Sequence, residues 1–164
     1  MLKASDFIKD KIKEFEGCKL KAYQLPGECY YTVGYGHYGS DVQDRKYTKK
    51  EVLEFFEKDI RLHEERVNYY DSKYNWTPYE FDALLSFSFN IGSIHGLTFR
   101  GARTKDEIAD MILKYNKDSR LVELPGLTKR RKWEHDLFVN GYPAAELEGE
   151  IDVISGDAYE KTEE

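Results

Sequence analysis

Hydrophobic residues recur at helical spacing near the start of the chain. The apolar positions of residues 6–16 fall on one face of a helix, and they are Phe7, Ile8, Ile12 and Phe15. Gly17 follows this segment, and glycine is a common residue at a helix end. The pattern predicts a short amphipathic helix whose last turn contains Glu16.

Beyond this helix the pattern becomes typical of strands. Residues 20–23 and 30–36 are rich in aromatic and β-branched side chains, and a Pro-Gly pair between them favours a turn. We therefore predict a β-hairpin. Its second strand contains Gly34 and Gly36, and glycines inside a strand usually mark a bulge or the close approach of another backbone.

Helices are predicted over most of the remaining chain. Three segments match the capping box, and they start at Thr48, Thr77 and Thr104. Residues 49–69 keep apolar side chains near helical spacing among charges, which predicts a long amphipathic helix. Residues 78–91 are apolar nearly all round, which predicts the buried centre of a helical bundle. Residues 108–115 predict another amphipathic helix, and Gly141 is expected to end the last one.

Composition limits the class of protein. The 164 residues are 40% hydrophobic, which suffices for one core or for two lobes that share a hinge. No apolar run approaches the ~20 residues of a membrane span, and the first residues do not begin a secretory signal. We expect a protein that is made in the cytosol and does not act in a membrane.

Acidic charge is concentrated at the C-terminal end. Residues 143–164 carry eight acids and one lysine, whereas residues 1–142 carry 24 basic and 23 acidic side chains. We expect a disordered acidic tail or a linker there, in preference to a strand-like element over residues 146–154 that docks on the body. The pI of 5.4 argues against nucleic-acid binding, and the basic run at residues 129–132 is interpreted as a solvated helix face.

Glu16 is a candidate general acid. A carboxylate in the last turn of a helix meets the negative end of the helix dipole, and apolar neighbours such as Phe15 and Leu20 would desolvate it. Both effects favour the protonated form, which a general acid needs. A lone glutamate at a helix end is nevertheless most often only solvated.

The sequence predicts no metal or cofactor site. His37 is interpreted as a structural histidine that pairs with an acidic neighbour, and residues 63–66 begin like a zinc-binding helix but lack its second histidine. Cys18 and Cys29 flank the hairpin, so a disulfide there is geometrically conceivable, but we expect free thiols in a protein made in the cytosol.

Three blocks of the sequence resemble phage-type lysozymes of glycoside hydrolase family 24. Residues 16–37 read Glu-Gly, a short basic and apolar run, Ala-Tyr, a turn, and then Thr-Val-Gly-Tyr-Gly-His. Residues 78–92 are similar to the central helix of that family, and residues 124–137 are similar to its closing helix. The blocks occur in the family's order and cover roughly residues 5–142, which a chance match to one short motif would not do.

The resemblance implies a mainly helical α+β, lysozyme-like fold. Residues 1–142 would form a catalytic domain with a small hairpin-bearing lobe and a helical lobe joined by a long helix, and residues 143–164 would be the tail. The implied activity is hydrolysis of the β-1,4 bond between N-acetylmuramic acid and N-acetylglucosamine in bacterial peptidoglycan by a phage or prophage endolysin. We expect a monomer without cofactors that forms in the host cytoplasm and reaches the wall without a signal peptide.

The resemblance also assigns roles to particular residues. Glu16 would be the general acid, and Thr32 would position the attacking water. Phe89 and Asn90 would lie in the cleft on the side of the second lobe. Tyr38 is a candidate for stacking on a sugar, although hairpin packing is an alternative for it.

The turn of the hairpin departs from the family pattern. The family places an Asp or Cys nine residues after the general acid, but Leu25 occupies that position here, and the turn has one extra residue. Glu28 is the only carboxylate in the turn and Cys29 the only thiol. Glu28 is therefore a candidate catalytic base, and a site that operates with Glu16 and a water held by Thr32 alone is the alternative.

Two other functions remain compatible with the sequence. A lysozyme-like body that has lost its second carboxylate would be a catalytically impaired module that only binds wall glycan. A chitinase built on the same fold would not require muramic acid in its substrate.

Overall fold

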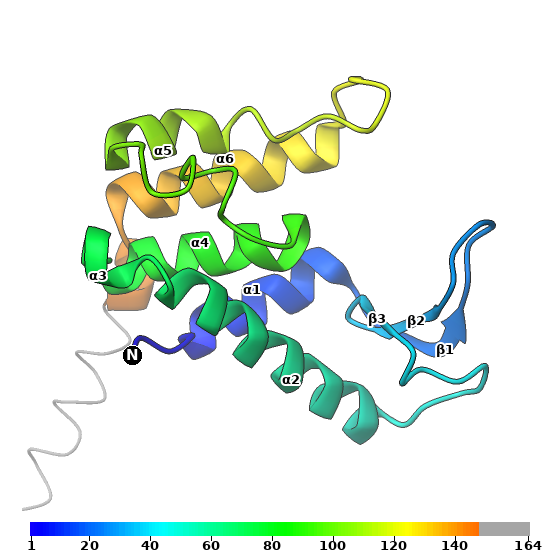
Figure 1. Cartoon of the computed structure of the whole chain (residues 1–164). Helices are drawn as coiled ribbons and strands as arrows, with labels where there is room; N and C mark the ends of the chain where they lie inside the picture. The colour runs from blue at the N-terminus through cyan, green and yellow to red at the C-terminus, as the bar shows by residue number, and fades with distance from the viewer. Residues whose placement is uncertain (148–164) are drawn as a thin grey trace, which may run out of the picture.

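The structure, a computed structural model, describes residues 1–147 (Figure 1). Within these residues the chain forms six helices and one three-stranded sheet, and their order is α1 (Asp6–Glu16), β1 (Lys19–Tyr23), β2 (Tyr31–Gly34), β3 (His37–Gly39), α2 (Lys49–Asn68), α3 (Asp71–Tyr74), α4 (Pro78–Ile91), α5 (Lys105–Ile112) and α6 (Pro125–Asn140). The helices gather in one lobe and the sheet forms a second, smaller one. The predicted mainly helical α+β architecture is confirmed.

Helix α4 is the centre of the helical lobe, as its nearly uniform apolar character predicts. Residues 80–88 are all buried, and α1, α2 and α6 pack against the helix. At its start, the Thr77 side chain accepts a hydrogen bond from the Glu80 backbone, and the Glu80 side chain accepts one from the Thr77 backbone. This reciprocal capping box satisfies two of the free N–H groups at the helix N-terminus.

Asp82, near the start of α4, joins the two ends of the described chain. Its carboxylate accepts hydrogen bonds from the Ser5 hydroxyl at 2.5 Å and from the Tyr142 hydroxyl at 2.7 Å. Ser5 also caps α1, whose residues Ile8 and Ile12 are fully buried against the lobe. One buried side chain thus fixes both the first helix and the segment that follows the last one.

The hairpin is confirmed, but its second strand is shorter than predicted. Strand β2 ends at Gly34, and a tight turn through Gly36 leads into β3, an antiparallel third strand that the sequence analysis missed. Both glycines have positive φ angles, +66° and +83°, which favour a turn over continued strand. Gly34 also lies against α2, since a Cβ atom built on it would be only 2.8 Å from the Val52 Cβ.

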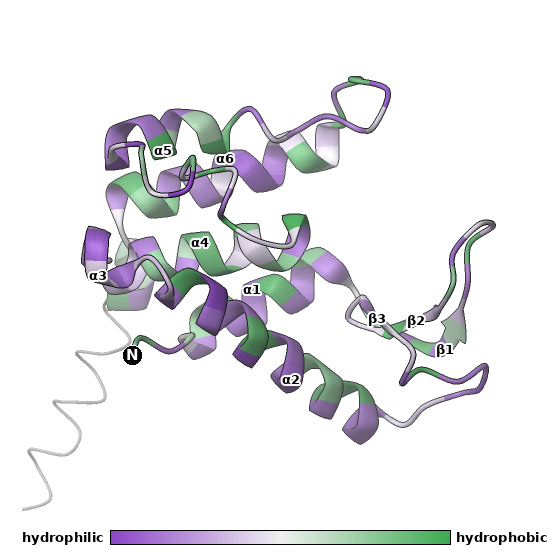
Figure 2. Cartoon of the chain, viewed as in Figure 1, coloured by the Kyte–Doolittle hydropathy of each residue, from purple (hydrophilic) through white to green (hydrophobic). Residues whose placement is uncertain are grey.

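Helix α2 connects the two lobes, as predicted from its length. It packs against α4 in the helical lobe and against β2 and β3 in the small lobe, and hydrophilic and hydrophobic residues alternate along it (Figure 2). Of the two hydrogen bonds of the capping box predicted at its start, one forms. The Thr48 side chain accepts from the Glu51 backbone, but the Glu51 carboxylate instead binds the Arg45 guanidinium at 2.9 Å.

His37 attaches the sheet to α2 through a buried ion pair. Its Nδ1 atom lies 2.8 Å from an Asp59 carboxylate oxygen, and its Nε2 atom lies 2.9 Å from Asp41. The ring also stacks on Phe55 with a centroid distance of 4.2 Å. Burial alone would lower the pKa of His37, but the hydrogen bonds and charges of the two carboxylates outweigh it, so the pKa is raised. The prediction of a structural histidine with an acidic partner is confirmed.

The last helix ends as predicted. Helix α6 stops at Asn140, and Gly141 follows with a φ of +81°. Residues 144–147 are helical, so the start of the strand-like element considered over residues 146–154 does not form a strand. The rest of that element and of the predicted acidic tail lies outside the described residues.

Candidate active site

The Glu16 carboxylate lies where the helical lobe meets the sheet. It belongs to the last residue of α1, and its Oε1 atom accepts a hydrogen bond from Arg130 Nη1 on α6 at 2.6 Å. Its other oxygen points toward the turn between β2 and β3, since a Cβ atom built on Gly36 would lie 3.4 Å from Oε2. The side chain keeps 19% of its surface exposed. The carboxylate is thus held firmly from one side and remains accessible from another.

The basic run on α6 is split between surface and interior, which corrects the interpretation of residues 129–132 as a solvated face. Lys129 and Lys132 are exposed, but Arg130 and Arg131 are buried. Arg130 donates to the Ser86 carbonyl at 3.1 Å and lies over the Phe15 ring, 4.8 Å from its centroid. Arg130 therefore offers the Glu16 carboxylate a charged hydrogen-bond donor that is itself held in place.

A fully buried carboxylate lies behind the two arginines. Glu134 Oε1 is 2.7 Å from Arg131 Nη2 and 3.6 Å from Arg130 Nε, and the Glu134 side chain has no exposed surface. Burial raises the pKa of Glu134 to about 7, although both guanidinium groups act to lower it. Arg131 also donates to Asn90 Oδ1 at 2.8 Å, at the end of α4.

Sequence reasoning missed these three residues, although the spacing contains a signal. Arg130, Arg131 and Glu134 precede the buried pair Leu137 and Phe138 by three to eight residues, so all five recur on one face of α6. Charged residues at the apolar positions of a helix are buried with partners from elsewhere. That pattern distinguishes a buried ionic network from a solvated face.

The two other predicted catalytic residues lie in the small lobe. Thr32 is buried on β2, and its Cα partners across the sheet are Tyr23 and Tyr38. Glu28 lies in the turn between β1 and β2, where its carboxylate accepts a hydrogen bond from the Leu25 N–H at 3.0 Å. The structure thus brings Glu16 to the β2–β3 turn, but the hydrogen bonds of Glu28 stay within its own turn.

The three predicted substrate-binding residues occupy different surroundings. Tyr38 on β3 is 47% exposed and meets the Tyr30 ring edge-on at a centroid distance of 5.5 Å, so it offers a ring face on the surface of the small lobe. Asn90 is exposed and is oriented by Arg131. Phe89 is half-buried and packs on Phe56 with a centroid distance of 5.7 Å, so part of it belongs to the core.

Other features of residues 1–147 bear on the chemistry. Cys18 and Cys29 are exposed free thiols in this structure. No cluster of three or more potential metal ligands occurs among these residues, and none of their helices has the length and apolar character of a membrane span.

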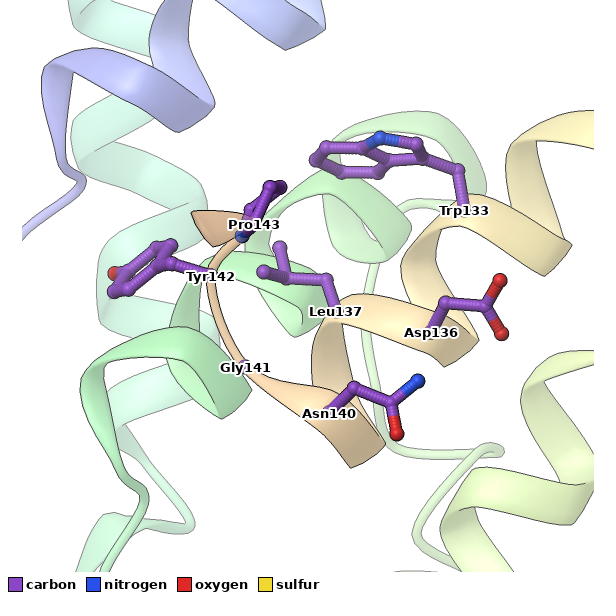
Figure 3. A pocket seen from close by; sticks show the side chains of 7 residues that line it. All are labelled: Trp133, Asp136, Leu137, Asn140, Gly141, Tyr142 and Pro143. Carbon is purple, nitrogen blue, oxygen red and sulfur yellow. The ribbon is translucent and has the colours of Figure 1, made fainter. Parts of the chain in front are cut away.

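A pocket of about 310 Å³ lies at the C-terminal end of α6 (Figure 3). It contains none of the predicted site residues, and its lining consists of Trp133, Asp136, Leu137, Asn140, Gly141, Tyr142 and Pro143. Asp136 is the one carboxylate in this lining, so the pocket lacks the paired carboxyl groups that hydrolysis of a glycosidic bond requires.

Comparison with known proteins agrees with this geometry. The family model named Phage lysozyme matches residues 13–134, which include Glu16, Thr32 and the buried arginines. The chain belongs to the phage lysozyme family. Over 138 residues the chain is 41% identical to an endolysin of Bacillus phage B103. The match covers 79% of the chain and 51% of that endolysin. The chain thus spans about half the length of the curated relatives it matches first.

Solved structures show the same fold. The muramidase domain of SpmX from Asticaccaulis excentricus superposes with a TM-score of 0.73 at 28% identity, covering 85% of this chain and 99% of that domain. An endolysin from Escherichia coli O157:H7 phage FAHEc1 gives a TM-score of 0.69 at 28% identity, covering 87% and 97%. The family's lysozyme-like architecture therefore extends over the whole described body of the chain.

Proposed function

We propose that the chain is a muramidase that hydrolyses the β-1,4 bond between N-acetylmuramic acid and N-acetylglucosamine in bacterial peptidoglycan. The observation that carries this proposal is the Glu16 carboxylate, held by Arg130 at 2.6 Å and facing the β2–β3 turn. The family, the endolysin relatives and the muramidase-domain neighbour support the same substrate class.

Glu16 acts as the general acid that protonates the leaving glycosidic oxygen. Once the proton has left, the carboxylate carries a full negative charge, and the Arg130 guanidinium beside it stabilises that charge. Because the guanidinium is held by the Ser86 carbonyl and by the Phe15 ring, it needs little reorganisation during the reaction. Arg130 on α6 thus stabilises the charge that develops on the acid.

Thr32 positions the water that attacks the sugar, and Glu28 takes the proton from that water. In an inverting glycosidase the two carboxyl groups lie about 6.5–9.5 Å apart, because the water must fit between them. Glu28 therefore needs no contact with Glu16. The inverted anomer is the expected product, since no side chain attacks the sugar.

The biological setting follows from the same assignment. We place the protein among phage or prophage endolysins, made as a monomer in the host cytoplasm and acting on the cell wall. The catalytic unit is residues 1–142, and residues 143–164 serve as an acidic tail or linker. Lysis of the host is the outcome.

The test is release of reducing ends from purified peptidoglycan, with the new sugar terminus identified. Glu16→Gln is expected to lower the rate by about 10²–10⁴-fold, the range for loss of a general acid. Glu14→Gln is the matched control, because Glu14 lies on the same helix with 72% of its side chain exposed. Activity retained by Glu16→Gln would refute the assignment of the acid.

Glu28→Gln separates the two alternatives for the base. A loss of about 10²-fold or more would support Glu28 as the base, and unchanged activity would assign the reaction to Glu16 and Thr32 alone. A wild-type chain that binds peptidoglycan and releases no sugar would support the glycan-binding module instead. Equal cleavage of chitin oligomers would indicate a chitinase.

A further inference from the structure

Glu134 is a fully buried charged group near the proposed acid. Its side chain has no exposed surface, it comes from the middle of α6, and within the described residues its ion-pair partners are the two arginines of the same helix. Neither carboxylate oxygen has a well-directed hydrogen bond within the described residues. Burial of a carboxylate carries a desolvation penalty, so its role is to be sought in the partners that it contacts.

The buried charges of this region balance only when Glu134 is counted. Arg130 and Arg131 bring two positive charges into the interior, and Glu16 and Glu134 bring two negative ones. On the side of α4, the arginines meet the neutral Ser86 and Asn90. Without the charge of Glu134, Glu16 would be the only carboxylate among the described residues within ion-pair distance of either guanidinium group.

The two arginines lead from Glu134 to different parts of the site. Arg130 reaches Glu16 at 2.6 Å, and Arg131 reaches Asn90 Oδ1 at 2.8 Å. Each guanidinium also rests on an aromatic ring, Arg130 on Phe15 and Arg131 on Phe87, at 4.8 and 4.9 Å from the ring centroids. Outside α6, Arg130 is held by Glu16 and the Ser86 carbonyl and Arg131 by Asn90, and Glu134 is the ionic partner that both guanidinium groups share.

We propose that Glu134 is a positioning residue, which acts through Arg130 on the acid Glu16 and through Arg131 on the substrate-binding Asn90. This inference rests on the proposed muramidase function. It assigns to a single buried carboxylate the alignment of both the proton donor at the end of α1 and a sugar-binding amide at the end of α4.

The test is a comparison of kcat and KM for wild type and Glu134→Gln at two pH values. Glutamine keeps the shape of the side chain and removes its charge. At pH 8, where Glu134 is ionised in the wild type, the variant is expected to lose at least tenfold in kcat, because Arg130 then lacks the buried charge that aligns it with Glu16. At pH 5.5, where Glu134 is largely protonated in the wild type, the two proteins are expected to agree within about threefold, since a pKa near 7 leaves only a small ionised fraction there.

Asp82→Asn is the matched control. Like Glu134, Asp82 is a buried carboxylate, but its partners Ser5 and Tyr142 lie outside the site. The kcat of Asp82→Asn is therefore expected to match that of the wild type at both pH values. A loss for Glu134→Gln that is equal at both pH values would indicate a merely structural role and would overturn the proposal. So would unchanged kinetics at pH 8.

Arg131→Gln tests the second branch, and it also decides the matter if Glu134→Gln does not fold. Its expected effect is a rise in KM of about tenfold with kcat changed less than threefold, because it releases Asn90 and leaves Arg130 on Glu16. A change confined to kcat would refute this branch. If the wild-type chain is inactive on peptidoglycan, the proposed function itself is refuted. If the wild type is active and the variants behave like it, only the positioning role of Glu134 is refuted.

Discussion

The buried ring of His63 should make the folded protein less stable in mild acid. The ring lies buried on α2, with its Nδ1 atom 2.8 Å from the Ser88 hydroxyl and the Phe89 ring at a centroid distance of 5.4 Å. Burial, assisted by the positive charge of Arg66, lowers the pKa of His63 from 6.5 to about 4. The folded protein therefore keeps this ring neutral at pH values where the unfolded chain protonates it.

The sign and size of the effect follow from linkage. Above pH 6.5 the ring is neutral in both states and contributes nothing, and stability falls as the pH drops below 6.5 because the unfolded state binds more protons. With pKa values of 6.5 unfolded and about 4 folded, the loss between pH 7.5 and pH 5 is about 2 kcal/mol. It approaches about 3 kcal/mol at pH 4.

The assay is urea denaturation of wild type and His63→Gln at pH 7.5 and pH 5. Glutamine can keep a hydrogen bond to Ser88 but does not titrate, so the variant is expected to lose about 2 kcal/mol less than wild type over this interval. Every other titrating group is common to both proteins and cancels in the comparison. Ser88→Ala is the control, because it removes the hydrogen bond and retains the ring, and it should keep the wild-type pH dependence.

Equal pH dependence in wild type and His63→Gln would refute the reasoning. It would mean that the ring is protonated in the folded state, and that His63 has a partner for its charge. A direct titration of the ring by NMR would then give a midpoint near 6.5 instead of about 4.

Three further predictions concern the core and the small lobe. Gly34→Ala should cost about 2–4 kcal/mol, measured as a lower melting temperature, because it combines a positive φ with a Cβ placed 2.8 Å from Val52 Cβ; an unchanged melting temperature would contradict the close contact. Asp59→Asn should lower the free energy of unfolding by about 1–2 kcal/mol at pH 6 and by less at pH 9. The pKa of His37 is raised in the folded state, so the stability that its ion pair contributes is fully present below pH 6.5 and is lost as the pH rises through the folded pKa. Equal shifts of the urea midpoint at both pH values would contradict this prediction. Phe81→Ala should cost about 3–5 kcal/mol in urea denaturation, because the ring is fully buried in α4, and a loss below 1 kcal/mol would show that the site collapses around the gap.

The elements that are defined by local pattern were predictable from the sequence. The bounds of α1 follow from its apolar spacing and Gly17, and the burial of α4 follows from its uniform apolar character. The hairpin follows from its turn residues. The missed strand β3 has only three residues, and its start is defined by the φ angle of Gly36, which a glycine in a sequence permits but does not require.

The electrostatics of the site were not predictable in the same way. Glu16 and Arg130 are 114 residues apart, and no local pattern indicates that they meet. The helix end suggested an isolated carboxylate, whereas the fold supplies a guanidinium. The half-formed capping box at Thr48 has a more local cause, since Arg45, six residues before Glu51, binds the Glu51 carboxylate that would complete the box.

The hydrogen bonds of Asp82 have a consequence for the order of the chain. Because Ser5 and Tyr142 bind the same carboxylate, the first and last parts of the folded body are neighbours, at the end of the helical lobe opposite the sheet (Figure 1). A short peptide is sufficient to join them. The folded chain therefore forms a nearly closed loop whose two ends meet at Asp82. A circularly permuted chain, opened instead in the exposed loop at residues 119–121, should therefore fold to the same structure with the same site.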